Sequence, residues 1–237
     1  SGANLPGGGI NIWYLEAFCR SGAHTQDWHQ TVMPHRTKLI SASPDGRRLD
    51  FSTTVGAVEV KHSVTTTTDE VDMKFTLTNN GEENLDLQWF EPACIRLAEF
   101  TGLDQQHFIS KSFIFTEKGL TRLDEVRRTE AAPYKGGQVY LPRTVNDVDA
   151  NPRPLSLDRP VNGLIGCFSA DNQWLLATAS SKTHELFEGV YVCLHSDPAV
   201  NGLRPHQTKQ IRSKIYLMRN DVKALQKRYK KDFPEGG

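Results

Sequence analysis

Two neighbouring segments of the chain, Val58–Thr67 and Val71–Thr78, alternate apolar and polar residues with a period of two. This period places every second side chain on one face of an extended strand, whereas a helix repeats every 3.6 residues. Turn signals border them at Ser43–Gly46 and Asn79–Gly81, where glycine adopts the φ > 0 that tight turns require. Such segments are typical of half-buried antiparallel strands joined by hairpins.

Further strand-like segments follow, at Leu85–Leu97, His107–Thr116, Gly163–Ser169, Trp174–Ser180, Gly189–Leu194 and Lys209–Met218. Pro92 has no amide proton to donate, so we expect a break or bulge there. Helical spacing is convincing only at Asn220–Lys231, where Asp221 can support the N-terminus. Strands and helices do not alternate and no long repeat is present. We therefore predict an all-β fold, a large antiparallel β-sandwich with a short C-terminal helix at 220–232.

We expect residues 1–237 to form a single sandwich domain. The Gly-rich segment 1–36 is predicted to be irregular. Residues 124–160 contain five prolines and little periodicity. A segment of this length without regular structure is usually functional when it is ordered.

The composition narrows the choice of partners. Lys plus Arg is 28 and Asp plus Glu is 28, so the formal net charge is zero. This balance gives no electrostatic reason to expect nucleic acid or an anionic membrane as partner, and no apolar run is long enough to span a bilayer. The location is left open, with export and a removed leader as one alternative. The four cysteines favour buried free thiols, with disulfides as the alternative in an exported protein.

Two stretches carry a resemblance to a known family. The first is VDMKFTLTNNGEENLDLQWFEPACI (71–95), and the second combines VCLHSDP (192–198) with LRPHQTKQIRSKIYL (203–217). They resemble the galactose-mutarotase-like β-supersandwich proteins, which bind or act on sugars. The chain also resembles a group of bacterial proteins through WFEPACIRLAEFTG, NGLIGCFSAD and QIRSKIY, a resemblance that implies no chemistry.

The mutarotase resemblance implies a catalytic acid–base pair at Glu91 and His195. Where that family has its glutamate base, this chain has His195, and Glu91 aligns with the histidine acid. The two residue types are therefore exchanged. Sugar-ring opening needs one group to take the proton of the anomeric hydroxyl and another to protonate the ring oxygen, and burial can bring the pKa values of imidazole and carboxyl close together. Alternatively, the exchange means that mutarotation is absent.

Six further residues are candidates for sugar binding. Aromatic faces stack on sugar rings, while Arg and His bind hydroxyl or carboxylate groups. We expect the N-terminal loop to contribute part of the site, and the strand around Pro92 and the His-Glu pair near 184 to contribute the rest. The candidates are Trp28, His35, Arg36, Trp89, Arg96 and His184. Each also has a purely structural interpretation, as a buried core residue or a loop anchor.

Other chemistries have weaker support. The sequence contains no G-x-S-x-G motif and no phosphate-binding loop. A metal site of His184 and Glu185 with His29 or His35 lacks any established spacing, so we expect no metal and no cofactor. Glycosidase chemistry would require Glu91 to share a cleft with Glu185 or Asp197. We predict a carbohydrate-interacting protein, either an epimerase-, mutarotase- or lyase-like enzyme on a sugar or sugar acid, or a non-catalytic binding module or interaction domain.

Overall fold

The computed structural model describes residues 8–26, 28–145 and 149–234. They form two antiparallel sheets, which confirms the predicted all-β sandwich. The larger sheet has nine strands in the order β2 (His35–Ala42), β3 (Arg48–Val55), β4 (Val58–Thr66), β5 (Glu70–Asn79), β14 (Thr208–Arg219), β11 (Trp174–Ser180), β10 (Leu164–Phe168), β7 (Ser112–Thr116) and β8 (Gly119–Arg122). The smaller sheet has five, in the order β1 (Asn11–Cys19), β6 (Trp89–Arg96), β13 (Cys193–Pro198), β12 (Thr183–Gly189) and β9 (Gln138–Tyr140).

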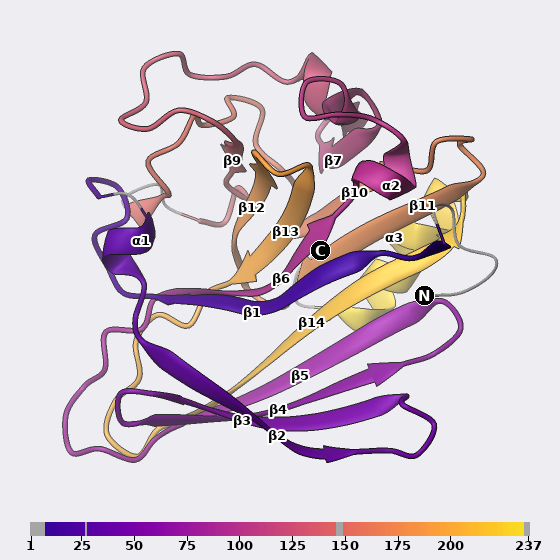
Figure 1. Ribbon diagram of the computed structural model, residues 1–237. Helices are drawn as coiled ribbons and strands as arrows, with labels where there is room; N and C mark the ends of the chain where they lie inside the picture. Colours follow the sequence, from indigo (N-terminus) through magenta and orange to yellow (C-terminus); the bar gives the residue numbers. More distant parts are fainter. Residues whose placement is uncertain (1–7, 27, 146–148, 235–237) are drawn as a thin grey trace.

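The main hydrophobic core lies between the two sheets. Figure 1 shows β1 and β6 stacked over β14 and β5. The alternating segments that predicted the fold are β4 and β5, whose inward residues include Val60, Met73 and Phe75. The five-stranded sheet faces them with Phe18 and Phe90, whose rings stack with centroids 5.3 Å apart. One face of the smaller sheet is therefore fixed in the core, and its other face points away from it.

The predicted C-terminal helix is α3 (Val222–Asp232), which packs on the outer face of the nine-stranded sheet. Leu225, Tyr229 and Phe233 join the buried residues of that face. The Asp221 carboxylate caps the helix by accepting a hydrogen bond of 2.9 Å from the amide of Ala224, as expected. The remaining helical elements are single turns: α1 (Trp28–Thr31), α2 (Ala98–Thr101), η2 (Phe108–Ser110) and η3 (Leu123–Glu125). None of the helices in the described ranges has the length and apolar character needed to cross a membrane.

Three local predictions need correction. The predicted strand Gly189–Leu194 is interrupted by a turn at residues 190–192, which separates β12 from β13. The segment 1–36 is not irregular throughout, because it contains β1, which pairs with β6 along the smaller sheet. Its strand pattern is masked by Leu15, whose φ of 55° interrupts the alternation. The predicted strand 107–116 begins only at Ser112. The residues before it turn because the Asp104 carboxylate accepts hydrogen bonds from two following amides, and η2 comes next.

The described parts of the proline-rich segment, 124–145 and 149–160, contribute β9 to the five-stranded sheet, which corrects the expectation of no regular structure, and also cover part of its outer face. Within it, Val139 forms a parallel bridge with Leu155, and an apolar cluster of Val139, Leu141 and Ala150 packs against Phe187 of β12. The segment therefore forms a wall above the face that points away from the core.

Candidate functional site

A cavity of about 110 Å³ lies on the outward face of the five-stranded sheet. Its floor comes from β1, β6, β12 and β13, and its sides come from the β12–β13 turn and from the proline-rich segment. The lining residues are Glu16, Trp89, Glu91, Cys94, Arg96, Gly136, Asn151, Arg153, Phe187, Gly189, Val190, Tyr191, Cys193 and His195. The predicted catalytic residues Glu91 and His195 both line this cavity, together with two of the predicted binding residues, Trp89 and Arg96.

The irregularity at Pro92 determines which side chains of β6 reach the cavity. Phe90, Ala93 and Ile95 point into the core, so the alternation shifts by one residue at Pro92. Glu91 and Cys94 consequently share one face, although they are three residues apart. The partner strand β1 compensates with a bulge, since its register with β6 shifts between Tyr14 and Ala17. The predicted break at Pro92 is therefore confirmed, and it shapes the floor of the cavity.

Glu91, His195 and Asp197 form a buried acid–base cluster. His195 Nε2 lies 3.6 Å from Glu91 Oε1 across β6 and β13. His195 Nδ1 lies 2.8 Å from Asp197 Oδ2, within hydrogen-bond distance. Asp197 is fully buried and His195 is 6% exposed, so both groups interact in an environment that screens charge weakly. The ring of Phe187 packs against the imidazole with centroids 4.8 Å apart and fixes its plane.

Burial and neighbouring charges determine the protonation of this cluster. Burial raises the pKa of Glu91 to about 8, with repulsion from Asp197 adding to it and His195 opposing it. Burial alone would lower the pKa of His195, but the attraction of Asp197 and Glu91 raises it well above its usual value. The imidazole is therefore held as a cation by Asp197, while Glu91 exchanges its proton near neutral to mildly alkaline pH.

A further carboxyl, that of Glu185, lies behind this cluster. Glu185 of β12 pairs in register with Asp197 of β13 and is fully buried. Its Oε2 accepts a hydrogen bond of 3.2 Å from the amide of Asn151. Burial, helped by Asp197, raises the pKa of Glu185 to about 8. Neither Glu185 nor Asp197 lines the cavity, so the glycosidase arrangement, in which Glu91 shares a cleft with one of them, is not found.

His184 and Trp89 form a stacked pair at one end of the cavity. Their rings are nearly parallel, at 6°, with centroids 5.8 Å apart. His184 covers one indole face, and Trp89 is only 2% exposed. The expectation of an open stacking platform at Trp89 is therefore wrong. Trp89 presents its Nε1–H instead, a donor without a partner among the described residues. His184 lies behind Trp89 and does not line the cavity, so it acts on a ligand only through the indole.

The thiols of Cys94 and Cys193 and the carboxyl of Glu16 complete the floor. All four cysteines are free and buried. The Cys193 thiol is hydrogen-bonded to Cys94, which lowers the pKa of Cys193 to about 6, an effect that His195 and Arg96 reinforce. Glu16, Glu91 and Cys94 offer ligand atoms within 4.8 Å of one another and could hold a divalent cation. This set differs from the combination of His184 and Glu185 with His29 or His35 that the sequence suggests.

The mouth of the cavity carries an aromatic pair around Arg96. The guanidinium carbon lies 3.8 Å from the ring centroid of Trp13 and 4.8 Å from that of Tyr191. Trp13 is 48% exposed and Tyr191 is 69% exposed, so both present large apolar surfaces to solvent. Sequence reasoning missed both residues. Trp13 could have been found as the outward position between the inward-packing Ile12 and Tyr14.

The predicted contribution of the N-terminal loop is not found at this cavity. His35 and Arg36 belong to β2, whose pairing with β3 carries them to the edge of the other sheet. The His35 ring packs edge-on against Phe18, with centroids 5.3 Å apart, and Arg36 is exposed. The prediction that they complete the site is therefore wrong, because strand pairing separates them from it. The side chain of Trp28 lies outside the described residues.

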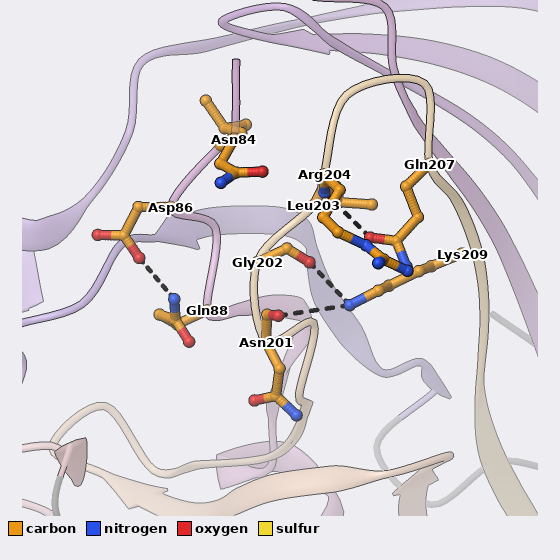
Figure 2. A pocket seen from close by; sticks show the side chains of 10 residues that line it. Asn84, Asp86, Gln88, Asn201, Gly202, Leu203, Arg204, Gln207 and Lys209 are labelled. Carbon is orange, nitrogen blue, oxygen red and sulfur yellow. Dashed lines mark hydrogen bonds between the residues drawn. The ribbon is translucent and has the colours of Figure 1, made fainter. Parts of the chain in front are cut away.

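A larger surface hollow, of about 450 Å³, lies between residues 84–88 and 201–209. Figure 2 shows that Lys209 turns its amino group toward the backbone of this hollow, with dashed hydrogen bonds to Gly202 and Asn201. The amino group also donates to the carbonyl of Val200 at 2.6 Å. The Lys209 cation is bound to backbone carbonyls and is therefore not available to a ligand in this hollow.

Comparisons with known proteins give structural likenesses only. No family model matches the sequence, and no curated protein matches it. Among solved structures, the chain is similar to a galactose mutarotase-like protein from Lactobacillus casei (TM-score 0.46, 10% identity, covering 88% of this chain and 84% of that one). It is also similar to a galactose mutarotase-like protein from Clostridium acetobutylicum (TM-score 0.46, 9% identity, 89% and 79%) and to a protein from Synechocystis (TM-score 0.47, 12% identity, 89% and 78%). These likenesses concern the arrangement of strands alone.

Proposed function

We propose that this protein is a carbohydrate-interacting enzyme that interconverts the two anomers of a reducing monosaccharide by acid–base catalysis. The observation that carries the proposal is the contact between Glu91 and His195, whose Oε1 and Nε2 lie 3.6 Å apart in a small cavity. A buried carboxyl that can take up a proton, next to a buried imidazole that is held protonated, is a combination that suits general acid–base catalysis.

In the proposed reaction, ionised Glu91 takes the proton of the anomeric hydroxyl as the C1–O5 bond of the sugar breaks. The His195 imidazolium donates its Nε2 proton to the ring oxygen, so the sugar opens to an aldehyde with a hydroxyl at C5. Rotation about the C1–C2 bond and reversal of both proton transfers then close the other anomer. Asp197 holds the imidazole in orientation and stabilises its charged form through the 2.8 Å contact to Nδ1.

The separation of the two groups fits this reaction. The anomeric oxygen and the ring oxygen are bonded to the same carbon, so the acid and the base must reach two neighbouring atoms. Two groups 3.6 Å apart on adjacent strands can serve both atoms from one side. The exchange of residue types along the sequence does not prevent the reaction. Asp197 holds His195 protonated, so the histidine is the acid and Glu91 is the base.

The cavity also limits the substrate. Pockets for drug-sized ligands measure about 300–1,000 Å³, whereas this one measures about 110 Å³. A volume of this size is too small for an oligosaccharide chain. Phe187 offers an apolar wall and Trp89 an unpaired N–H donor, a combination that suits a ring with both C–H faces and hydroxyl groups.

The test is acceleration of anomer exchange, measured by saturation-transfer NMR on a panel of free monosaccharides and uronic acids. We expect acceleration by the wild-type protein and its loss in Glu91→Gln and His195→Gln. The chain offers a matched control, because His206 and Glu82 form an exposed pair with Nε2 and Oε2 3.4 Å apart. The variants His206→Gln and Glu82→Gln should retain full activity. Sugar binding without any acceleration would favour a binding module instead, and no binding across the panel would favour an interaction domain.

A further inference from the structure

Arg96 is held in a fixed orientation at the mouth of the cavity. Its guanidinium lies between the rings of Trp13 and Tyr191, at 3.8 and 4.8 Å from their centroids. Its Nη1 donates a hydrogen bond of 3.3 Å to the carbonyl of Tyr191. Stacking on two rings restricts the plane of the guanidinium and leaves its edge as the remaining binding surface.

This edge lacks an anionic partner. The Nε–H of Arg96 is buried and has no hydrogen-bond acceptor among the residues that the structure describes, and none of their carboxylates forms an ion pair with it. Arg96 is half-buried, so its guanidinium is partly desolvated and would gain from pairing with an anion. A guanidinium whose edge is fixed and unpaired suits the two oxygens of a carboxylate.

The separation between Arg96 and the acid–base pair determines which carbon of the ligand would carry that carboxylate. Arg96 is paired in register with Cys193 of β13, and His195 lies two residues further along the same face. Two residues of an antiparallel strand span about 7 Å. A single sugar ring whose C5 substituent is a carboxylate can therefore place its anomeric carbon at Glu91 and His195 and its carboxylate at Arg96.

The charges around the cavity favour a carboxylate over a phosphate. Glu16 and Glu91 line the same cavity and would repel a dianion more strongly than a monoanion. The His195 cation is already paired with Asp197, and the other lining arginine, Arg153, directs its Nη1 to the carbonyls of Lys135 and Gly136. One oriented guanidinium matches one singly charged group.

We propose that the ligand of this cavity is a uronic acid, with its carboxylate bound by Arg96. The proposal rests on the acid–base function proposed above for the same cavity, and it assigns Arg96 as the residue that determines specificity.

The test compares ligands that differ only at C6, D-glucuronate with D-glucose and D-galacturonate with D-galactose, by calorimetric titration. We expect the wild-type protein to bind one uronate about 10- to 100-fold more tightly than its neutral counterpart. Arg96→Met, which keeps an unbranched side chain between the two rings, should lose this preference while its affinity for the neutral sugar is unchanged. Arg219→Met is the matched control, since Arg219 lies 4.3 Å from the ring centroid of Trp174 at a distant surface.

The outcomes separate this inference from the proposed function. Equal wild-type affinities for uronate and neutral sugar, or tighter binding of glucose 6-phosphate than of glucuronate, would overturn the inference. An equal loss of affinity for both members of a pair in Arg96→Met would also overturn it, because it would show a merely structural arginine. A uronate preference that depends on Arg96, without accelerated anomer exchange, would support the inference and contradict only the acid–base function.

Discussion

Glu91 and His195 lie on adjacent strands of the smaller sheet, with Oε1 and Nε2 3.6 Å apart, and Asp197 lies 2.8 Å from the other imidazole nitrogen. The sequence resemblance placed a histidine where a glutamate base is expected and a glutamate where a histidine acid is expected. In three dimensions the two side chains meet in one cavity, so their order along the chain does not assign the roles. Asp197 assigns them, because it stabilises the charged imidazole and leaves Glu91 as the group that accepts a proton.

Glu91→Gln removes the proposed base and keeps the shape of the side chain. We expect anomer exchange at about pH 8 to fall by about 10²–10⁴-fold. In the wild type, Glu91 must be ionised to act, so the rate should rise as the pH increases through the Glu91 pKa of about 8. The rise should be absent from the residual rate of the variant. A pH–rate profile of both proteins checks this, and an unchanged profile in Glu91→Gln would exclude Glu91 as the base.

Asp197→Asn keeps a hydrogen-bonding group next to His195 but removes the negative charge. Because that charge raises the pKa of His195, the variant should hold its imidazolium only to lower pH. The alkaline limb of the rate profile, and the titration of the His195 ring followed by NMR, should both move to lower pH. Glu82→Gln, beside the exposed His206, should leave both curves in place. The assignment fails if His195 titrates at the same pH in Asp197→Asn as in the wild type.

Glu185→Gln tests the buried carboxyl through stability. The folded protein holds the Glu185 proton up to about pH 8, whereas the unfolded chain releases it near 4.5. The free energy of unfolding of the wild type therefore decreases as the pH rises through this window. Glutamine does not titrate, so the variant should gain stability relative to the wild type between about pH 5 and about pH 9. Thermal unfolding at the two pH values measures the gain, and a pH-independent difference would contradict the assignment.

Lys214→Ala tests how the C-terminal helix is held. Lys214 is 3% exposed, and its Nζ lies 2.9 Å from both Glu70 Oε2 and Asp232 Oδ2, which joins β14, β5 and the end of α3. Its removal leaves two carboxylates without this partner and should lower the free energy of unfolding by about 3 kcal/mol. Denaturant titration checks this, with Lys61→Ala as the control, because Lys61 pairs with Glu59 at the exposed surface. Similar losses in both variants would show that burial of the pair contributes nothing.

Strands with one face in the core and the other face exposed can be predicted from the sequence. Val60, Phe75 and Ile215 point into the core from strands that alternate cleanly, so the period of two identifies them. The first strand was not recognised, because the left-handed backbone at Leu15 interrupts its pattern, and a bulge of this kind is stabilised only by the partner strand. Pro92 was recognised as a break from its missing amide proton alone.

The site was predictable only in part. The amino-acid sequence indicates the alternating strands, the break at Pro92 and the acid–base pair of Glu91 and His195, although it places His195 at the end of a strand and not within β13. Only the tertiary structure decided that Glu91 and His195 share one cavity, that His35 and Arg36 belong to the other sheet, and that Trp13 and Tyr191 enclose Arg96. The alternation of apolar and polar residues shows which face of its strand a side chain occupies. The distance between two side chains depends instead on the register between strands that lie far apart in the sequence.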